Sequence, residues 1–151
     1  MPLPLYHCMG MVLGNLVCLT KGAAVVYPNS SFDAVSTLDA VEKHGCTGLY
    51  GVPTMFNAIL AENEKRPRNV STLRKGIISG AASPAPLINK INADLNMKGL
   101  CQVYGMTELS PVATMMGPDV PLEKKMNTVG FAGPMIEIKL ADEQGAIVPF
   151  G

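Results

Sequence analysis

The sequence predicts an α/β fold in which a mostly parallel sheet is flanked by helices, followed by the start of a small antiparallel β layer or barrel. Short, wholly apolar runs alternate with segments whose apolar residues recur at helical spacing. Such runs are typical of strands covered by helices on both faces. After Pro111 they give way to short strand-like runs, two of which are joined by a polar turn. We therefore expect an α/β subdomain over residues 1–111 and the start of an antiparallel β subdomain over residues 112–151, both parts of one incomplete domain.

Local signals mark the ends of the expected elements. Gly22 stands where a helix C-terminal cap is expected, and Asp33 or Ser36 can cap the next helix. Pro53 suits the first turn of a helix, and residues 62–68 form a charged surface connection. The expected helices are 8–20, 33–44, 53–60 and 87–96; the parallel strands are 23–27, 46–50, 76–79 and 99–104; the antiparallel strands are 112–116, 135–140 and 146–148.

Composition excludes several classes of partner. The 151 residues are 48% hydrophobic, and a mean hydropathy of +0.24 indicates a real core. Lys plus Arg (12) equals Asp plus Glu (12), so no basic field recruits nucleic acid or an anionic membrane surface. Asn15 and Lys21 interrupt the longest apolar stretch near the start, so we expect no membrane span. The partners that remain are small-molecule substrates, and the oligomeric state stays open.

The cysteines and the chain ends carry two further expectations. Cys8, Cys18, Cys46 and Cys101 form no CxxC pair and lie in apolar surroundings. We expect buried free thiols in an intracellular, reducing compartment, and no structural zinc site. The chain shows no secretory signal, opens inside an apolar segment and stops just after a predicted hairpin, so we expect an internal fragment of a longer protein.

Residues 102–108 form the most informative stretch, because a buried strand ends there in a polar corner. Ligands of open α/β sheets bind beyond the carboxyl ends of the strands. Our hypothesis is that Tyr104 lies flat on a base beside the turn at Gly105, that Thr107 meets phosphate, and that Glu108 holds Mg²⁺. The alternative is a strand-end tyrosine that fills the core, followed by a solvent-facing turn.

Other segments of the sequence, taken together with residues 102–108, indicate a protein family. With the loop of small residues at 79–84 upstream, the sequence resembles the adenylate-forming enzymes, which include acyl-CoA synthetases, peptide-synthetase adenylation domains and luciferases. The similarity extends to residues 4–10, 51–54 and 128–134, in the order of the family. Each piece alone is weak evidence, but together they cover almost the whole chain.

The resemblance implies a ligase that uses ATP, Mg²⁺ and coenzyme A. A carboxylate would attack the α-phosphate of ATP to give an acyl-adenylate, and the thiol of coenzyme A would then take the acyl group. The family's nucleotide-binding positions fall on Gly80, Ala81, Ala82, Gln102, Tyr104, Gly105, Met106 and Thr107, and its metal-binding carboxylate falls on Glu108. Thr107, Glu108 and His7 are the expected catalytic residues. Small side chains at 80–82 allow the backbone to approach a flat ligand, whereas Gln102 could equally be a structural strand residue.

The resemblance also implies a substrate. The expected acid-binding residues are His7, Met9, Gly51, Val52, Gly80 and Gly130, with Gly10 as a further candidate and plain packing as the alternative. Residues 5–9 contain no carboxylate to pair with an ammonium group, which favours a simple acid over an amino acid. Resemblance alone favours a medium-chain fatty acid and the mitochondrial matrix, and an aryl-acid-activating relative is the alternative.

Several parts of the family's machinery do not match any segment of this chain. The phosphate loop, the ribose-binding aspartate and the catalytic lysine would all lie outside residues 1–151. We therefore expect the chain to be inactive alone, and the alternative is a nucleotide or acyl-adenylate binding module, or an interaction module, without turnover. A dinucleotide-dependent oxidoreductase is disfavoured, because no GxGxxG follows any expected strand.

Overall fold

The fold is an open α/β sheet that carries helices, as the sequence predicts. The computed structural model describes residues 1–149. Five strands lie in the order β1-β2-β3-β4-β5. Strands β1 (Gly48–Gly51), β2 (Lys75–Ile78) and β3 (Gly99–Gly105) run parallel, and β4 (Val112–Met116) and β5 (Phe131–Ala132) add antiparallel pairs at the β3 side. The carboxyl ends of the parallel strands therefore meet at the same edge of the sheet.

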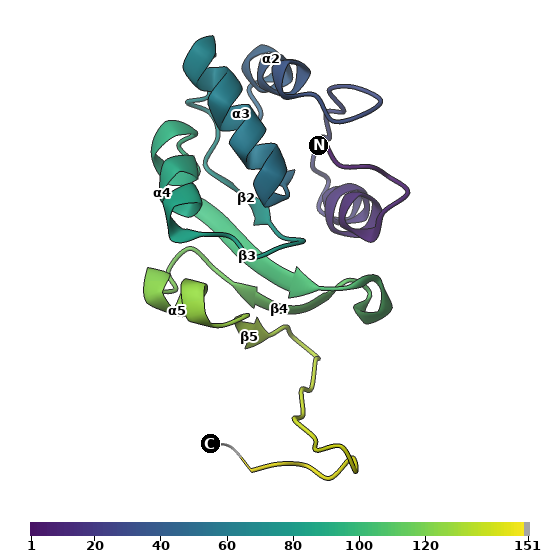
Figure 1. The fold of residues 1–151 in the computed structure, drawn as a ribbon. Helices are drawn as coiled ribbons and strands as arrows, with labels where there is room; N and C mark the ends of the chain where they lie inside the picture. The colour runs from purple at the N-terminus through teal and green to yellow at the C-terminus, as the bar shows by residue number, and fades with distance from the viewer. Residues whose placement is uncertain (150–151) are drawn as a thin grey trace.

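Three helices cover the parallel strands (Figure 1). Helix α2 (Ala34–His44) begins at Asp33, whose carboxylate accepts the Ser36 N–H, and ends at Gly45 in the left-handed conformation. Helix α3 (Pro53–Lys65) begins with its proline, which needs no N–H partner there. Helix α4 (Ala85–Asp94) follows the loop after β2. Helices α2 and α3 confirm the predictions made from Asp33 and Pro53, and α4 confirms the helix expected at 87–96.

One apolar core joins these helices to the sheet. Phe56 on α3 is 0% exposed and packs with fully buried residues of α2 and α4 and of the adjoining connections. This cluster contains Leu38, Ile59, Leu73, Ile91, Leu95 and Met97. The remaining elements are thinner: α5 (Leu122–Asn127) lies near β4 and β5, and η2 (Thr107–Leu109) is a single 3₁₀ turn.

The N-terminal segment departs from two predictions. The expected helix at 8–20 forms, but as a π-helix η1 (Met9–Leu16) continued by α1 (Val17–Thr20). Apolar spacing alone does not distinguish these helix types. The expected strand at 23–27 is wrong, because these residues form no ladder with any described strand. An apolar run becomes a strand only where a neighbour pairs with its backbone.

The C-terminal segment departs from the prediction of a separate layer. Antiparallel pairing at 112–116 is confirmed, but β4 and β5 extend the parallel sheet itself, which stays open. The expected strands at 135–140 and 146–148 are wrong; they reduce to one isolated bridge between Ala141 and Ile147 around a turn at Asp142. Figure 1 shows this segment leading away from the sheet, where a lone hairpin is marginal. The proposed division at residue 111 stays a prediction.

Two surface expectations also change. Arg68 lies in the connection expected to be exposed, yet it is only 7% exposed. Its Nε donates to Asp39 at 2.9 Å and its Nη1 to Glu62 at 3.0 Å, so it ties α2 to α3. The free cysteines are half-buried rather than buried. None of the helices among residues 1–149 is both long and apolar enough to cross a membrane.

Replacing Phe56 tests whether this core holds the fold together. Phe56→Ala removes a fully buried ring, so we expect the free energy of unfolding to fall by about 3–5 kcal/mol. Phe32→Ala is the control, because Phe32 is 37% exposed and should cost much less. Urea unfolding followed by circular dichroism measures both, and equal losses would show that Phe56 is not a core residue.

Candidate functional site

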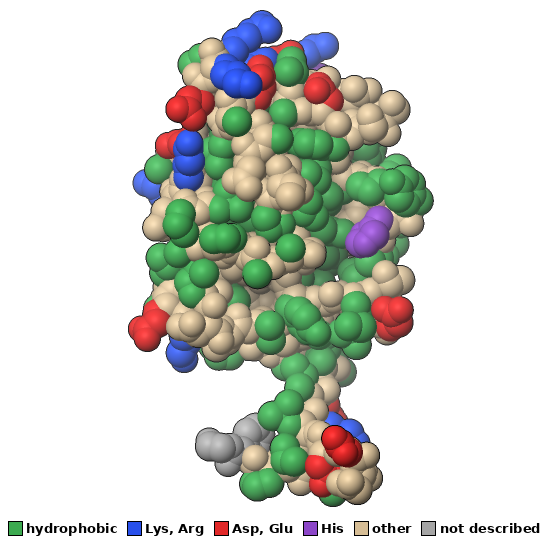
Figure 2. All heavy atoms as spheres, viewed as in Figure 1, with side chains coloured by type: hydrophobic (Ala, Val, Ile, Leu, Met, Phe, Trp, Pro, Cys, Tyr) green, Lys and Arg blue, Asp and Glu red, His purple; other side chains and the backbone are tan. Residues whose placement is uncertain are grey.

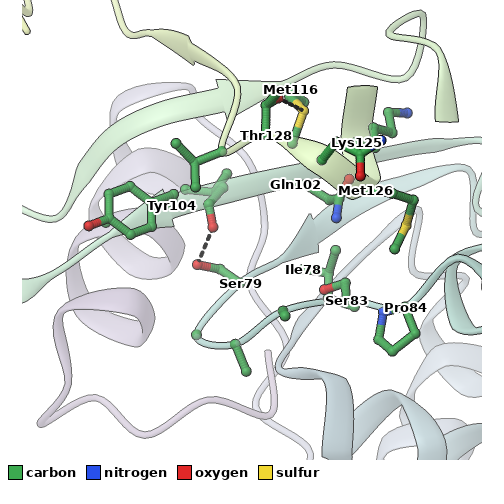
Figure 3. Close-up of a pocket in the computed structure, with 17 residues that line it drawn as sticks. Ile78, Ser79, Ser83, Pro84, Gln102, Tyr104, Met116, Lys125, Met126 and Thr128 are labelled. Carbon is green, nitrogen blue, oxygen red and sulfur yellow. Dashed lines mark hydrogen bonds between the residues drawn. The ribbon is translucent and has the colours of Figure 1, made fainter. Parts of the chain in front are cut away.

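A cleft of about 960 Å³ lies beyond the carboxyl ends of β2 and β3 (Figure 3). One wall is the loop at 79–84, and a second is the end of β3. A third wall, at 125–129, comes from α5 and the residues after it. In the space-filling view, charged side chains lie mostly toward the edges of the face, and hydrophobic ones occupy much of its middle (Figure 2). The residues that line the cleft are mostly apolar or small, with Lys125 as the charged side chain among them, so the cleft suits a largely uncharged group.

The loop wall is built from small residues. Gly80 has a φ of +89°, which favours glycine, and a Cβ there would lie 3.1 Å from Val52 Cγ1. Ala81 and Ala82 follow along the cleft wall. The last parallel pair is Ile78 with Gln102, and beyond it the Ser79 hydroxyl donates to the Val103 carbonyl at 2.7 Å. This bond fixes the loop to β3 where the strands begin to part.

The strand wall offers an aromatic face and an unpaired acceptor. Tyr104 is 44% exposed and lies on the cleft. Gln102 Oε1 is buried without a hydrogen-bond partner in the described chain, which is costly unless a ligand supplies a donor. Gly105 follows at a register shift opposite Val112, and a Cβ on it would meet the Pro111 carbonyl. A flat base carrying an N–H donor fits these features.

The polar corner lies directly after this wall. Met106, Thr107 and Glu108 are exposed, and Thr107 opens the turn η2. Among residues 1–149 no three His, Cys, Asp or Glu side chains gather as a metal site. A single exposed carboxylate still suits Mg²⁺, which takes its other oxygens from phosphate and water. Glu108 could therefore hold the ion only together with a bound phosphate.

A side chain of the N-terminal segment contacts this corner. Cys8 Sγ lies 3.5 Å from Thr107 Oγ1, although 99 residues separate them in sequence. His7 Nδ1 accepts the Met9 N–H at 3.1 Å. Because Nδ1 is an acceptor, a neutral His7 carries its proton on Nε2. The structure thus places two predicted catalytic residues, His7 and Thr107, on either side of Cys8.

The predicted acid-binding residues divide into two groups. Met9 and Val52 share one small apolar cluster, and Gly80 contacts Val52, so these three lie together. Gly51 instead faces the core, because a Cβ on it would meet the Phe56 ring at 3.2 Å. Gly130 packs against β4, where a Cβ would lie 2.7 Å from the Met115 carbonyl. Of the predicted acid-binding residues, Gly80 lines the cleft, whereas His7, Met9, Gly51, Val52 and Gly130 do not.

The third wall was not identified by any sequence pattern. Lys125, Met126 and Asn127 line the cleft from the end of α5. Thr128 and Val129 continue it, and the Thr114 hydroxyl donates to the Val129 carbonyl to hold the wall on β4. The signal that could have found this wall is the segment 128–134, which resembles the family without suggesting a role for residues 125–129.

Comparison with known proteins agrees with this geometry. The family model described as AMP-binding enzyme matches residues 1–151. The chain belongs to the AMP-binding enzyme family. It is 41% identical over 150 residues to the acyl-CoA ligase sidI of Aspergillus fumigatus. That match covers 99% of this chain and 25% of the relative. It is 39% identical over 142 residues to the mitochondrial medium-chain acyl-CoA ligase ACSF2 of Rattus norvegicus, covering 94% of this chain and 23% of the relative.

Solved structures of AMP-binding enzymes share the fold. The O-succinylbenzoate coenzyme A synthetase of Bacillus subtilis, solved in complex with ATP and magnesium ion, aligns with a TM-score of 0.79 and 26% identity over 99% of this chain and 30% of that one. The N-terminal domain of FACL13 from Mycobacterium tuberculosis aligns at 0.85 with 22% identity, over 98% and 36%. This chain spans about a quarter of the length of the curated relatives.

The apolar cluster around Leu3, Met9 and Met55 contains a titratable side chain, Tyr50. Tyr50 packs against Leu3, Met9 and Met55, and its burial raises the pKa of its hydroxyl. A raised pKa means that the unfolded chain ionises first as the pH rises. The stability that neutral Tyr50 contributes is therefore full below about pH 10 and is lost above it.

Tyr50→Phe should flatten this alkaline loss. We expect the free energy of unfolding of the unsubstituted protein to fall from about pH 10 upward, and the variant to fall less steeply. Tyr6→Phe is the control, because Tyr6 is 95% exposed. Denaturant unfolding across the alkaline range measures the slopes. Parallel slopes for all the proteins would contradict burial as the cause.

Proposed function

We propose that the protein containing this chain is an ATP-dependent acid–thiol ligase, which activates a fatty acid as acyl-adenylate and transfers it to coenzyme A. The observation that carries the proposal is the slot between the Gly80 loop and Tyr104, with the unpaired Gln102 acceptor in its wall. The names of the relatives support the same reaction type. The structure in complex with ATP and magnesium ion supports the nucleotide and the metal.

Each wall of the cleft then has a task. Tyr104 stacks on adenine, Gln102 accepts an adenine N–H, and the small loop residues let the backbone approach the base. Thr107 donates its hydroxyl to phosphate, and Glu108 would hold the magnesium ion. That ion would neutralise charge developing on the phosphate oxygens. The corner thus combines positioning with electrostatic stabilisation, which carry most of the catalysis in phosphate chemistry.

The acid would lie along the apolar side of the site. Met9 and Val52 lie in one apolar cluster, and Val52 in turn contacts Gly80 at the nucleotide slot. His7 would meet the carboxylate through its Nε2–H, because Nδ1 already accepts the Met9 N–H. Each methylene buried contributes about 0.8 kcal/mol, which favours an aliphatic acid over a short polar one. The relatives named as mitochondrial medium-chain acyl-CoA ligases support a medium-chain fatty acid as the substrate and a mitochondrial location.

Exchange of labelled pyrophosphate into ATP tests the function. The full-length protein should catalyse this exchange only when an acid is added, with the highest rates for medium-chain fatty acids over acetate, benzoate and amino acids. Preference for benzoate would favour an aryl-acid relative instead. The 151-residue chain alone should bind ATP without exchange. Binding without exchange in the full-length protein as well would support the noncatalytic module.

Glu108→Gln tests the metal-binding carboxylate. The amide keeps the size of the side chain but removes its charge, so we expect exchange in the full-length protein to fall about a hundredfold or more. The control is Glu64→Gln, because Glu64 pairs with Lys90 on the surface of α3 and α4. Near-normal exchange in Glu108→Gln across a magnesium titration would dismiss Glu108 as the ligand.

Gly80→Ala tests the nucleotide slot. The new Cβ would crowd Val52 and place alanine at a φ of +89°, so the loop should shift and ATP binding should weaken about tenfold. Gly22→Ala is the matched control, since it imposes a similar φ of +63° with nothing within 4 Å. Isothermal titration measures both affinities. An equal loss in the control would assign the effect to general backbone strain.

A further inference from the structure

The thiol of Cys8 joins the segment expected to bind the acid to the corner expected to bind phosphate. Its Sγ lies 3.5 Å from Thr107 Oγ1, a hydrogen-bond distance for sulfur. Cys8 precedes Met9 in the apolar cluster, and Thr107 precedes Glu108 at the corner. The sequence alone does not predict that Cys8 and Thr107 are in contact.

Packing fixes the backbone of Cys8. Met9 is 6% exposed and anchors the start of η1. Gly10 lies so close to the Pro4 carbonyl that a Cβ would clash with it, and the Gly10 N–H donates to the His7 carbonyl at 3.0 Å. The His7 N–H donates in turn to the Pro4 carbonyl at 3.2 Å. Cys8 is therefore held on both sides and presents its side chain in a fixed direction.

The thiol has two polar neighbours, and in its contact with Thr107 either the S–H or the hydroxyl can be the donor. His7 Nδ1 lies 3.8 Å away and already accepts the Met9 N–H. Thr107 Oγ1 is nearer, and a hydroxyl has two acceptor lone pairs besides its single hydrogen. Donation from the Cys8 S–H to Thr107 Oγ1 leaves the hydroxyl hydrogen free for another acceptor. The reverse direction would consume that hydrogen and leave Thr107 unable to donate.

We propose that Cys8 is a positioning residue that donates to Thr107 and so directs the Thr107 hydroxyl hydrogen toward a phosphate oxygen of ATP. This inference rests on the proposed function and deepens it. Cys8 does not touch the nucleotide; it acts through Thr107. Because Cys8 belongs to the acid-binding segment, it also makes phosphate binding depend on the position of that segment.

A double-mutant cycle in the full-length protein tests the coupling. Cys8→Ala should raise the KM for ATP in pyrophosphate exchange about two- to tenfold, the effect of one lost hydrogen bond, and leave the KM for the acid unchanged. In a Thr107→Val background, Cys8→Ala should have no further effect. Cys8→Ser keeps a donor and should stay within about twofold of the unsubstituted protein. Cys18→Ala is the matched control, as another half-buried cysteine, which lies on α1.

The outcomes separate the inference from the function it rests on. Exchange in the unsubstituted protein with additive effects of Cys8→Ala and Thr107→Val would overturn the inference and keep the function. A raised KM for the acid would assign Cys8 to the packing of residues 6–10 instead. Absence of exchange in the unsubstituted protein would overturn both.

Thiol labelling gives a second measurement that does not depend on turnover. Iodoacetamide labelling followed by peptide mass analysis reports each cysteine of the protein separately. Magnesium and ATP should slow labelling of Cys8, because a fixed Thr107 keeps the thiol engaged, and leave Cys18 and Cys46 unaffected. Equal protection of all the cysteines, or none at Cys8, would contradict the contact.

Discussion

The site depends on the separation of β2 and β3 at their carboxyl ends. Their ladder ends at Ile78 and Gln102, and the Ser79 hydroxyl supplies the last link, to the Val103 carbonyl. Past that bond the two chains must diverge, since the Gly80 loop turns toward Val52 and Tyr104 continues toward β4. The space between them is the cleft. Ligands bind at such edges of open α/β sheets because diverging backbones leave room and polar groups there.

Much of the fold could be predicted from short-range chemistry. Asp33, Gly45 and Pro53 mark helix ends because capping is satisfied within a few residues of chain. The run at 23–27 misled for the opposite reason. An apolar, β-branched run records that a segment can be buried, but strand formation needs a partner that local sequence does not specify. The prediction of strands on either side of the turn at Asp142 was wrong for a similar reason, because these segments have no surface to pack on.

The site was predictable only in part, for a related reason. Motif resemblance predicted roles for residues 80–82 and 104–108, which are local in sequence, and the structure places residues 80–82, Tyr104 and Gly105 on the cleft. The wall at 125–129 depends on where α5 lies relative to β4, and Gly51 and Gly130 lie in close packing outside the cleft lining. A glycine in a family-like segment has the same appearance whether it lines a ligand or allows two backbones to approach. Only the direction of the missing Cβ separates these cases.

The contact between Cys8 and Thr107 bears on how two substrates could react in one cleft. An acid oxygen must reach the α-phosphorus within about 3–3.5 Å, so small errors between their binding segments are costly. The segment proposed to bind the acid and the corner proposed to bind phosphate meet at Cys8 and Thr107, which lie 99 residues apart in sequence. Rigid strands alone would transmit any displacement of η1 into misalignment. A direct side-chain contact couples the positions of the two segments. The hydrogen bond of a thiol is long and weak, so it tolerates small adjustments while still orienting the hydroxyl.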